Sequence, residues 1–152
     1  EIKKRGLELN ETNERRVREH LRQELGMAAY ARLNRGRIDD ALKSSDVVID
    51  GLYSWEEYLY LKEYYRDSFY VVAVWASPKK RYARLGDRKN RPLTWDEAAS
   101  RDRAEIENLN KGGPIAVADF MIINESSLAD LKEGTKRIIL ELRNGNTSQT
   151  GY

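Results

Sequence analysis

Three short apolar runs, each followed by turn residues and then by a helical pattern, are the feature that constrains the fold most. The runs at residues 46–50, 69–76 and 119–124 are predicted to be strands. The middle run is almost continuously apolar, which is typical of a strand buried on both faces. Because helical patterns separate the runs, the sequence predicts an α/β fold with a three-layer α/β/α parallel sheet.

The first run delivers a carboxylate to the end of its strand. Asp50 follows three β-branched residues, and Gly51 lets the backbone turn sharply. Ser54 and Glu57 have capping-box spacing, so a helix is expected over residues 54–65. An acid at the carboxyl end of a parallel strand lies where open α/β sheets bind ligands. On this pattern alone, a plain strand end and turn cap is the better interpretation of Asp50.

Arginines crowd a predicted pair of helices at about residues 79–110. One helix begins at Pro78, and Thr94 with Glu97 forms a second capping box that begins the next helix. Guanidinium groups bind phosphate oxygens in a bidentate way and stabilise the charge of a transferring phosphoryl group. The same pattern fits a solvated helical hairpin whose arginines are neutralised by its own carboxylates. The spacing alone slightly favours this second interpretation. The arginines are Arg81, Arg84, Arg88, Arg91, Arg101 and Arg103.

The third run ends in a polar loop. Asn124 closes the strand, and Ser126 or Ser127 is expected to cap a final helix that ends near Leu142. In a parallel sheet this loop lies at the same edge as Asp50, where an amide could bind the edge of a base. Ordinary turn chemistry and a helix cap explain the residues about equally well.

Composition excludes several classes of site. The 152 residues contain no cysteine and one histidine, His20, so thiolate metal sites are excluded and zinc catalysis is not expected. Lys and Arg number 27 against 25 Asp and Glu, and this near balance argues against a dedicated nucleic-acid binder. No apolar run approaches the roughly 18 to 20 residues of a membrane span. We therefore expect a cytoplasmic protein with no membrane partner.

Taken in order, these segments resemble a known group. Residues 46–51, 76–78, the arginine hairpin, residues 100–105 and residues 118–126 are similar to the P-loop nucleotide kinase superfamily, and most of all to adenylate-kinase-related and dephospho-CoA-kinase-like proteins. The resemblance covers about residues 1–142. It implies ATP-dependent phosphoryl transfer to a nucleotide or nucleotide-containing acceptor, with ATP and Mg²⁺ as cofactors and the arginine hairpin as a helical lid.

The resemblance also implies a role for individual residues. Asp50 would serve Mg²⁺ through water, and Arg88 would lie against ATP. Arg101 and Arg103 would bind phosphate from the second helix of the lid, and these four residues would form the catalytic set. Two further residues, in the loop after the third strand, would lie beside adenine: Asn124 and Ser126.

Two departures from the family pattern affect these expectations. No glycine-rich loop ending Gly-Lys-Ser/Thr is present, so the chain alone is not expected to turn over ATP, and an amino-terminal extension is expected to supply that loop. Tyr53 stands where related proteins often carry an arginine, so the resemblance does not identify the residue that recognises the acceptor. A non-catalytic nucleotide-binding or regulatory module is the alternative function.

The expected organisation is one domain at residues 1–143 and a flexible tail at residues 144–152. Without a central strand, the sheet would have an open edge and an exposed apolar face. We therefore expect the 152 residues either to aggregate or to pair with another copy, with a homodimer as one form of that pairing.

Overall fold

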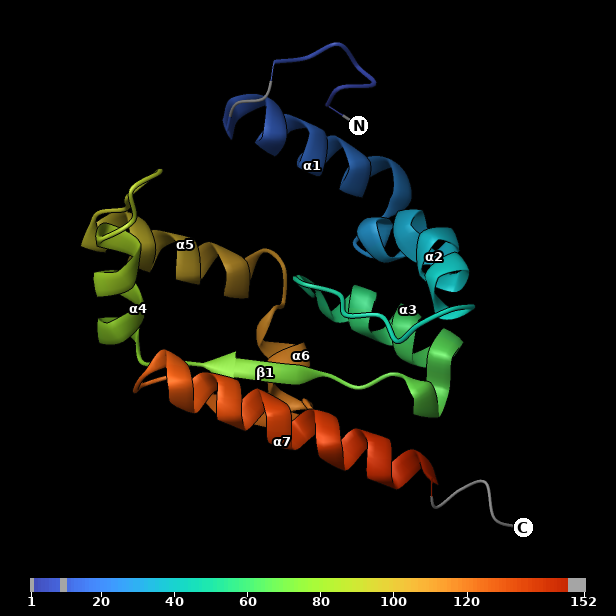
Figure 1. The fold of residues 1–152 in the computed structure, drawn as a ribbon. Coiled ribbons are helices and arrows are strands. Elements are labelled where there is room, and N and C mark those ends of the chain that lie inside the picture. Colours follow the sequence, from blue (N-terminus) through green and yellow to red (C-terminus); the bar gives the residue numbers. More distant parts are fainter. Residues whose placement is uncertain (1, 9–10, 148–152) are drawn as a thin grey trace. The chain divides into compact units, whose positions relative to one another are not determined.

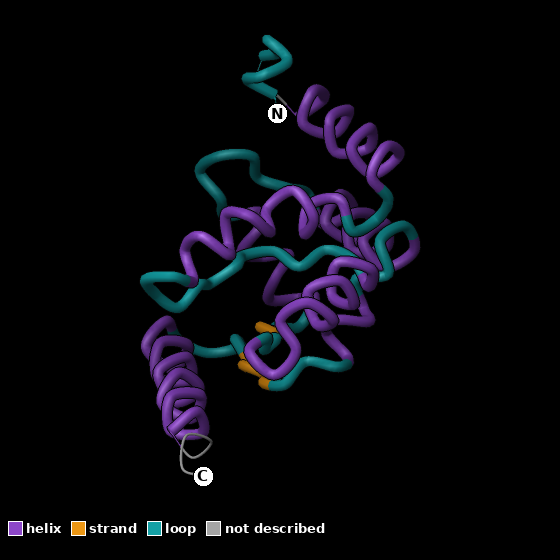
Figure 2. The backbone as a smooth tube through the Cα atoms, turned by 90° about the vertical axis from the view of Figure 1, so that its right-hand side faces the viewer, coloured by secondary structure: helices purple, strands orange, loops and turns teal. Residues whose placement is uncertain are grey.

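The computed structural model describes residues 2–8 and 11–147, which form an α/β protein of mostly helices with one small parallel sheet (Figures 1 and 2). The chain divides into two compact units. The first contains Glu1–Phe69 with Leu109–Gly113, and the second contains Tyr70–Asn108 with Pro114–Tyr152. The elements, in chain order, are α1 (Glu11–Leu25), α2 (Ala29–Leu42), α3 (Trp55–Tyr65), the 3-10 helix η1 (Arg66–Ser68), β1 (Val72–Trp75), α4 (Pro78–Gly86), α5 (Trp95–Glu107), α6 (Gly112–Ala116), β2 (Phe120–Ile123) and α7 (Leu128–Thr147).

Two small apolar clusters hold the helices of the first unit together. Val17 and Leu21 of α1 pack with Ala29 of α2, and Ile38 of α2 packs with Leu61 of α3. Val17 and Leu21 lie four residues apart, so they share one face of α1 and turn it inward.

The cap of α3 is built as predicted. The Ser54 hydroxyl accepts a hydrogen bond from the Glu57 N–H (3.1 Å) and donates to the Met27 carbonyl (3.0 Å). The Glu57 carboxylate in turn accepts from the Tyr53 N–H (3.0 Å). Ser54 is fully buried, so one side chain both begins α3 and ties it to the segment before α2.

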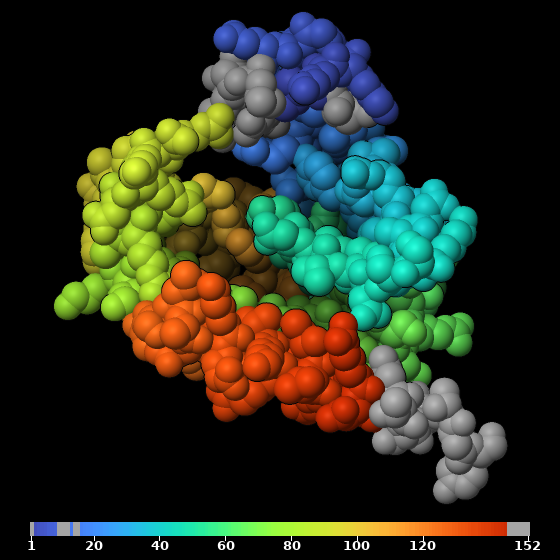
Figure 3. All heavy atoms as spheres, viewed as in Figure 1, coloured from blue at the N-terminus to red at the C-terminus, as the bar shows by residue number. Residues whose placement is uncertain are grey.

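In the second unit, β1 and β2 form a parallel pair with Val72 beside Phe120 and Trp75 beside Ile123. α7 packs on one face of this pair, where a Cβ added at Gly134 would lie 3.5 Å from the Ile122 side chain. The opposite side of α7 is exposed along its length, as Figure 3 shows in orange and red. Both strands lie within the runs predicted to form them.

The strand predicted at residues 46–50 does not form, and that prediction is wrong. The segment is irregular, and Val48 is 95% exposed. A strand needs a neighbour to take its backbone hydrogen bonds, and among the described residues only β1 and β2 are paired. The three-strand parallel sheet expected from the sequence is therefore a two-strand sheet in the part of the chain described.

The short helix α6 contains Pro114 in its first turn, which suits the fixed φ of proline. The last helix continues past Leu142 to Thr147, into the segment predicted as a tail, and residues 148–152 lie outside the described residues. Within residues 2–8 and 11–147, every helix is too short or too polar to cross a bilayer.

Candidate functional site

The carboxyl ends of β1 and β2 lie side by side, so the residues that follow the two strands meet at one edge. The Asn124 N–H donates to the Trp75 carbonyl (2.7 Å), which extends the parallel ladder one residue beyond β2. Ser77 follows β1 and Glu125 follows β2, and the two residues lie side by side. This is the edge at which open α/β sheets bind their ligands.

Glu125 joins the two loops. The Ser77 N–H donates to one oxygen of the Glu125 carboxylate, and the Ser77 hydroxyl donates to the other (3.2 Å). The backbone hydrogen bond from Ser77 is the main cause that holds the pKa of Glu125 below its usual value, and the nearby charges of Lys80 and Arg84 contribute less. Glu125 therefore places a fixed negative charge at the amino end of α4, where the helix dipole favours it. Sequence reasoning assigned Glu125 no role, although its place directly after a strand end was a usable signal.

Two of the clustered arginines hold the second unit together. Arg81 of α4 donates to both carboxylate oxygens of Asp102 on α5 (3.0 and 2.7 Å), and the Tyr82 hydroxyl donates to the same carboxylate (2.7 Å). Arg84 donates to the Asn124 carbonyl (2.9 Å). Arg81 thus fixes the α4–α5 hairpin, and Arg84 fixes α4 over the loop that follows β2.

The arginines predicted to bind phosphate make fewer contacts with other residues than Arg81 and Arg84 do. Arg88 and Arg103 are exposed and have no hydrogen-bond or ion-pair partner among residues 2–8 and 11–147, whereas Arg101 contacts Glu105 (3.3 Å) in an exposed pair. Arg101 and Arg103 lie two positions apart on α5, on either side of Asp102, so they do not share a face of the helix. Guanidinium groups without a protein partner can bind an anion without first breaking an ion pair.

The loop after β2 contains the two residues that were predicted to lie beside adenine, Asn124 and Ser126. Both backbone groups of Asn124 are used, but its side-chain amide makes no hydrogen bond to another described residue. The Ser127 hydroxyl donates to the Asp130 carboxylate (2.7 Å) and is the main cause that lowers the pKa of Asp130, and the Ser126 hydroxyl contributes less. The Asn124 amide therefore remains a candidate for recognition of a base. Ser127 caps α7, and a role for Ser126 beside a base stays a prediction.

Asp50 lies in the first unit, whereas the arginines and Asn124 lie in the second. Gly51 has φ +88°, so the sharp turn predicted there is confirmed. Asp50 itself follows an irregular segment, and its predicted place at the end of a strand is wrong. Its side chain is exposed and has no hydrogen-bond or ion-pair partner in the described part of the chain. A role for Asp50 beside Mg²⁺ stays a prediction.

Comparison with curated proteins identifies the family. A UPF0200 protein of Thermococcus kodakarensis is 36% identical over 146 residues, which cover 93% of this chain and 78% of the relative. The chain belongs to the UPF0200 family. A member from Thermococcus gammatolerans is 36% identical over 149 residues (95% and 78%), and one from Methanocaldococcus jannaschii is 33% identical over 147 residues (95% and 73%). No family model matches the sequence.

The described residues of this UPF0200 chain contain no group of three or more His, Asp or Glu side chains that could hold a metal ion by themselves. Mg²⁺ is commonly held by one or two carboxylates together with the phosphates of a substrate. One exposed carboxylate such as Asp50 fits that mode of binding, whereas a metal cage made only of protein does not fit these residues.

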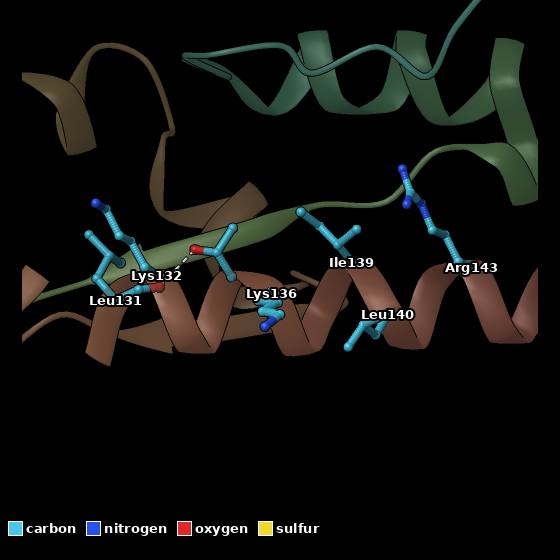
Figure 4. Close-up of a pocket in the computed structure, with 7 residues that line it drawn as sticks. Leu131, Lys132, Lys136, Ile139, Leu140 and Arg143 are labelled. Carbon is cyan, nitrogen blue, oxygen red and sulfur yellow. Dashed lines mark hydrogen bonds between the residues drawn. The ribbon is translucent and has the colours of Figure 1, made fainter. Parts of the chain in front are cut away.

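An open groove lies along α7, away from this edge (Figure 4). The surface exposed in the groove is mostly apolar, although four of the seven lining residues are polar or charged. A hydrogen bond within the groove runs from the Thr135 hydroxyl to the Leu131 carbonyl (2.8 Å). Polar groups do not converge on it, so it lacks what a small-ligand site needs for orientation and specificity. The carboxyl edge of the strands is the better candidate site. The groove residues all belong to α7: Leu131, Lys132, Thr135, Lys136, Ile139, Leu140 and Arg143.

Proposed function

We propose that this UPF0200 chain is part of an ATP-dependent phosphotransferase that acts on a nucleotide or a nucleotide-containing acceptor. The fold proposed with it is the three-layer sheet of P-loop nucleotide kinases, with α4 and α5 as a lid. One observation carries the proposal. At the carboxyl edge of a parallel strand pair, Arg84 fixes the Asn124 carbonyl. In the part of the chain that the structure describes, the Asn124 amide has no partner, and the side chains of Arg88 and Arg103 in the adjoining helical hairpin have none either.

Each of these groups has a role that its chemistry suits. Arg88 and Arg103 would bind phosphate oxygens, and Arg101 would join them by exchanging its exposed contact with Glu105 for a stronger bidentate one. Asn124 would hydrogen-bond a base. Asp50 would hold water on Mg²⁺. Bound ATP would supply the phosphoryl group, and Mg²⁺ would neutralise part of its charge.

A second function has its own support. The 152 residues contain no Gly-Lys-Ser/Thr phosphate loop, and the backbone amides and lysine of that loop cradle phosphates in P-loop enzymes. A module that binds a nucleotide without transferring phosphate needs only the groups listed above. Under this alternative, nucleotide binding is retained and phosphoryl transfer is absent.

Calorimetric titration with Mg²⁺-ATP tests nucleotide binding, which both functions require. We expect the chain to bind, and we expect Arg88→Ala and Arg103→Ala each to weaken binding by about tenfold or more, the effect of losing a hydrogen bond between charged groups. Arg137→Ala on the exposed side of α7 is the matched control and should leave the affinity unchanged. Absence of binding at millimolar ATP, or equal effects of all three substitutions, would refute the proposal.

Two further measurements separate the transferase from the module. The Thermococcus kodakarensis relative, incubated with Mg²⁺-ATP and a panel of nucleoside monophosphates and dephospho-CoA, should form ADP and a phosphorylated product if the family transfers phosphate. In this chain, Asp50→Ala should weaken binding of Mg²⁺-ATP but not of ATP without metal. Unchanged affinity in both titrations, together with no turnover, would favour the module.

A further inference from the structure

The loop after β2 is held to β1 and to the segment after it by four hydrogen bonds. The Asn124 N–H donates to the Trp75 carbonyl (2.7 Å), and Arg84 donates to the Asn124 carbonyl (2.9 Å). The Glu125 carboxylate accepts from the N–H and from the hydroxyl of Ser77. All of these residues belong to the second unit. The backbone that carries the Asn124 amide is therefore fixed before any ligand binds, so binding has to immobilise only the side chain itself.

The charge of Glu125 determines which part of a nucleotide suits this loop. The hydrogen bond from the Ser77 N–H is the main cause that lowers the pKa of Glu125, so the carboxylate is ionised at neutral pH. A phosphate beside this carboxylate would meet the repulsion of a like charge, whereas a neutral base would not. The loop after β2 therefore suits the base, and Arg88 and Arg103 suit the phosphates.

We propose that Glu125 is a positioning residue for recognition of the base, and that it acts by holding the loop from which the Asn124 amide contacts that base. An amide binds adenine by accepting from its amino group and donating to a ring nitrogen, and this bidentate contact needs a defined position. The two hydrogen bonds from Ser77 to Glu125 supply that position without touching the ligand. This inference rests on the proposed function, because it requires a nucleotide at this edge of the strands.

Calorimetric titration of the full chain with Mg²⁺-ATP and with Mg²⁺-tripolyphosphate separates binding of the base from binding of the phosphates. We expect Glu125→Ala to weaken ATP binding by about tenfold and not to weaken tripolyphosphate binding, because tripolyphosphate has no base. Glu125→Gln should lose less ATP affinity, since its amide oxygen can still accept from the Ser77 N–H. Glu133→Ala, at an exposed position of α7, is the control and should change neither affinity.

A double substitution tests whether Glu125 acts through Asn124. Asn124→Ala should weaken ATP binding, and the addition of Glu125→Ala should cause little further loss, because the effects of two residues on one contact do not add. A residue with a merely structural role would weaken both ligands, and its effect would add in full to that of Asn124→Ala. Glu125→Gln, combined with Asn124→Ala in the same way, keeps the test valid if Glu125→Ala fails to fold.

The outcomes distinguish this inference from the proposed function. ATP affinity that Glu125→Ala leaves unchanged, an equal loss for the two ligands, or full additivity with Asn124→Ala would overturn the inference and leave the proposed function standing. Absence of ATP binding by the wild type would refute the proposed function and the inference with it.

Discussion

Glu57 is the most buried carboxylate that the structure describes, with 2% of its surface exposed. One carboxylate oxygen accepts from the Tyr53 N–H, while the other is buried and has no partner among the described residues. Burial is the main cause that raises the pKa of Glu57 above its ordinary 4.5, and the charge of Arg22 offsets part of it. A buried ionised carboxylate destabilises the fold unless it is fully paired.

The sign of the resulting pH dependence follows from the raised pKa of Glu57. The folded chain holds this proton more tightly than the unfolded chain, so the free energy of unfolding should fall as pH rises from 4.5 through the folded-state pKa. We expect Glu57→Gln to flatten this slope in urea titrations at several pH values. Glu63→Gln, at an exposed position of the same helix, should not. Equal slopes for the wild type and Glu57→Gln would contradict the assignment.

Gly51 and Gly36 offer a matched pair of substitutions with opposite expected signs. Gly51 has φ +88°, and an added Cβ would lie 2.6 Å from the Tyr53 ring. Gly51→Ala should therefore lower the free energy of unfolding by about 1–2 kcal/mol or more. Gly36 lies in α2 with open space around it, so Gly36→Ala should raise that free energy by roughly 0.5–1 kcal/mol. Chemical denaturation measures both, and a stabilising Gly51→Ala would show that the turn is not strained.

At the scale of elements, the α4–α5 hairpin depends on one carboxylate. Asp102 accepts from Arg81 and from the Tyr82 hydroxyl, and the hydrogen bond from Tyr82 is the main cause that raises the pKa of that phenol. Asp102→Asn should lower the free energy of unfolding by about 1 kcal/mol, because the ion pair is partly solvated. The same substitution should return the pKa of Tyr82 toward its ordinary value.

Thermal unfolding and a spectroscopic titration of the tyrosines measure the two effects of Asp102→Asn. Asp96→Asn, at an exposed position of the same helix, is the control. A pKa of Tyr82 that Asp102→Asn leaves in place would show that another group raises it.

Sequence patterns located the helices of this chain because their end signals are local. Ser54 and Thr94 each accept a hydrogen bond from a backbone N–H of the helix that they begin, as their spacing predicts, and Ser77 does the same before Pro78. The segment at residues 46–50 has an equally clear strand composition and still forms no strand. A strand depends on a partner elsewhere, which no local pattern contains.

The candidate site could be predicted only in part, because the partner of each side chain lies elsewhere in the sequence. Arg88, Arg103 and Asn124 were selected from the sequence as anion- or base-binding residues, and their side chains have no protein partner in the part of the chain described. Arg81 and Arg84 carry the same charge but hold the unit together. Which arginine meets a carboxylate and which stays available depends on the packing of two helices, and charge spacing along one helix does not encode it.

At the scale of the whole molecule, the central claim is that the second unit binds ATP. Arg88, Arg103 and Asn124 all belong to that unit. The two arginines would bind the phosphates, and Asn124 would bind the base. Asp50 belongs to the first unit, and its proposed role beside the metal ion is tested separately by Asp50→Ala.

Titration of the ¹⁵N-labelled chain with Mn²⁺-ATP tests that claim most directly, because paramagnetic Mn²⁺ broadens the amide signals of nearby residues. We predict that the residues adjoining Arg88, Arg103 and Asn124 lose intensity together at the same ligand concentration, while residues of α1 do not. Broadening of only one of these three segments, or broadening spread evenly over the chain, would contradict the account.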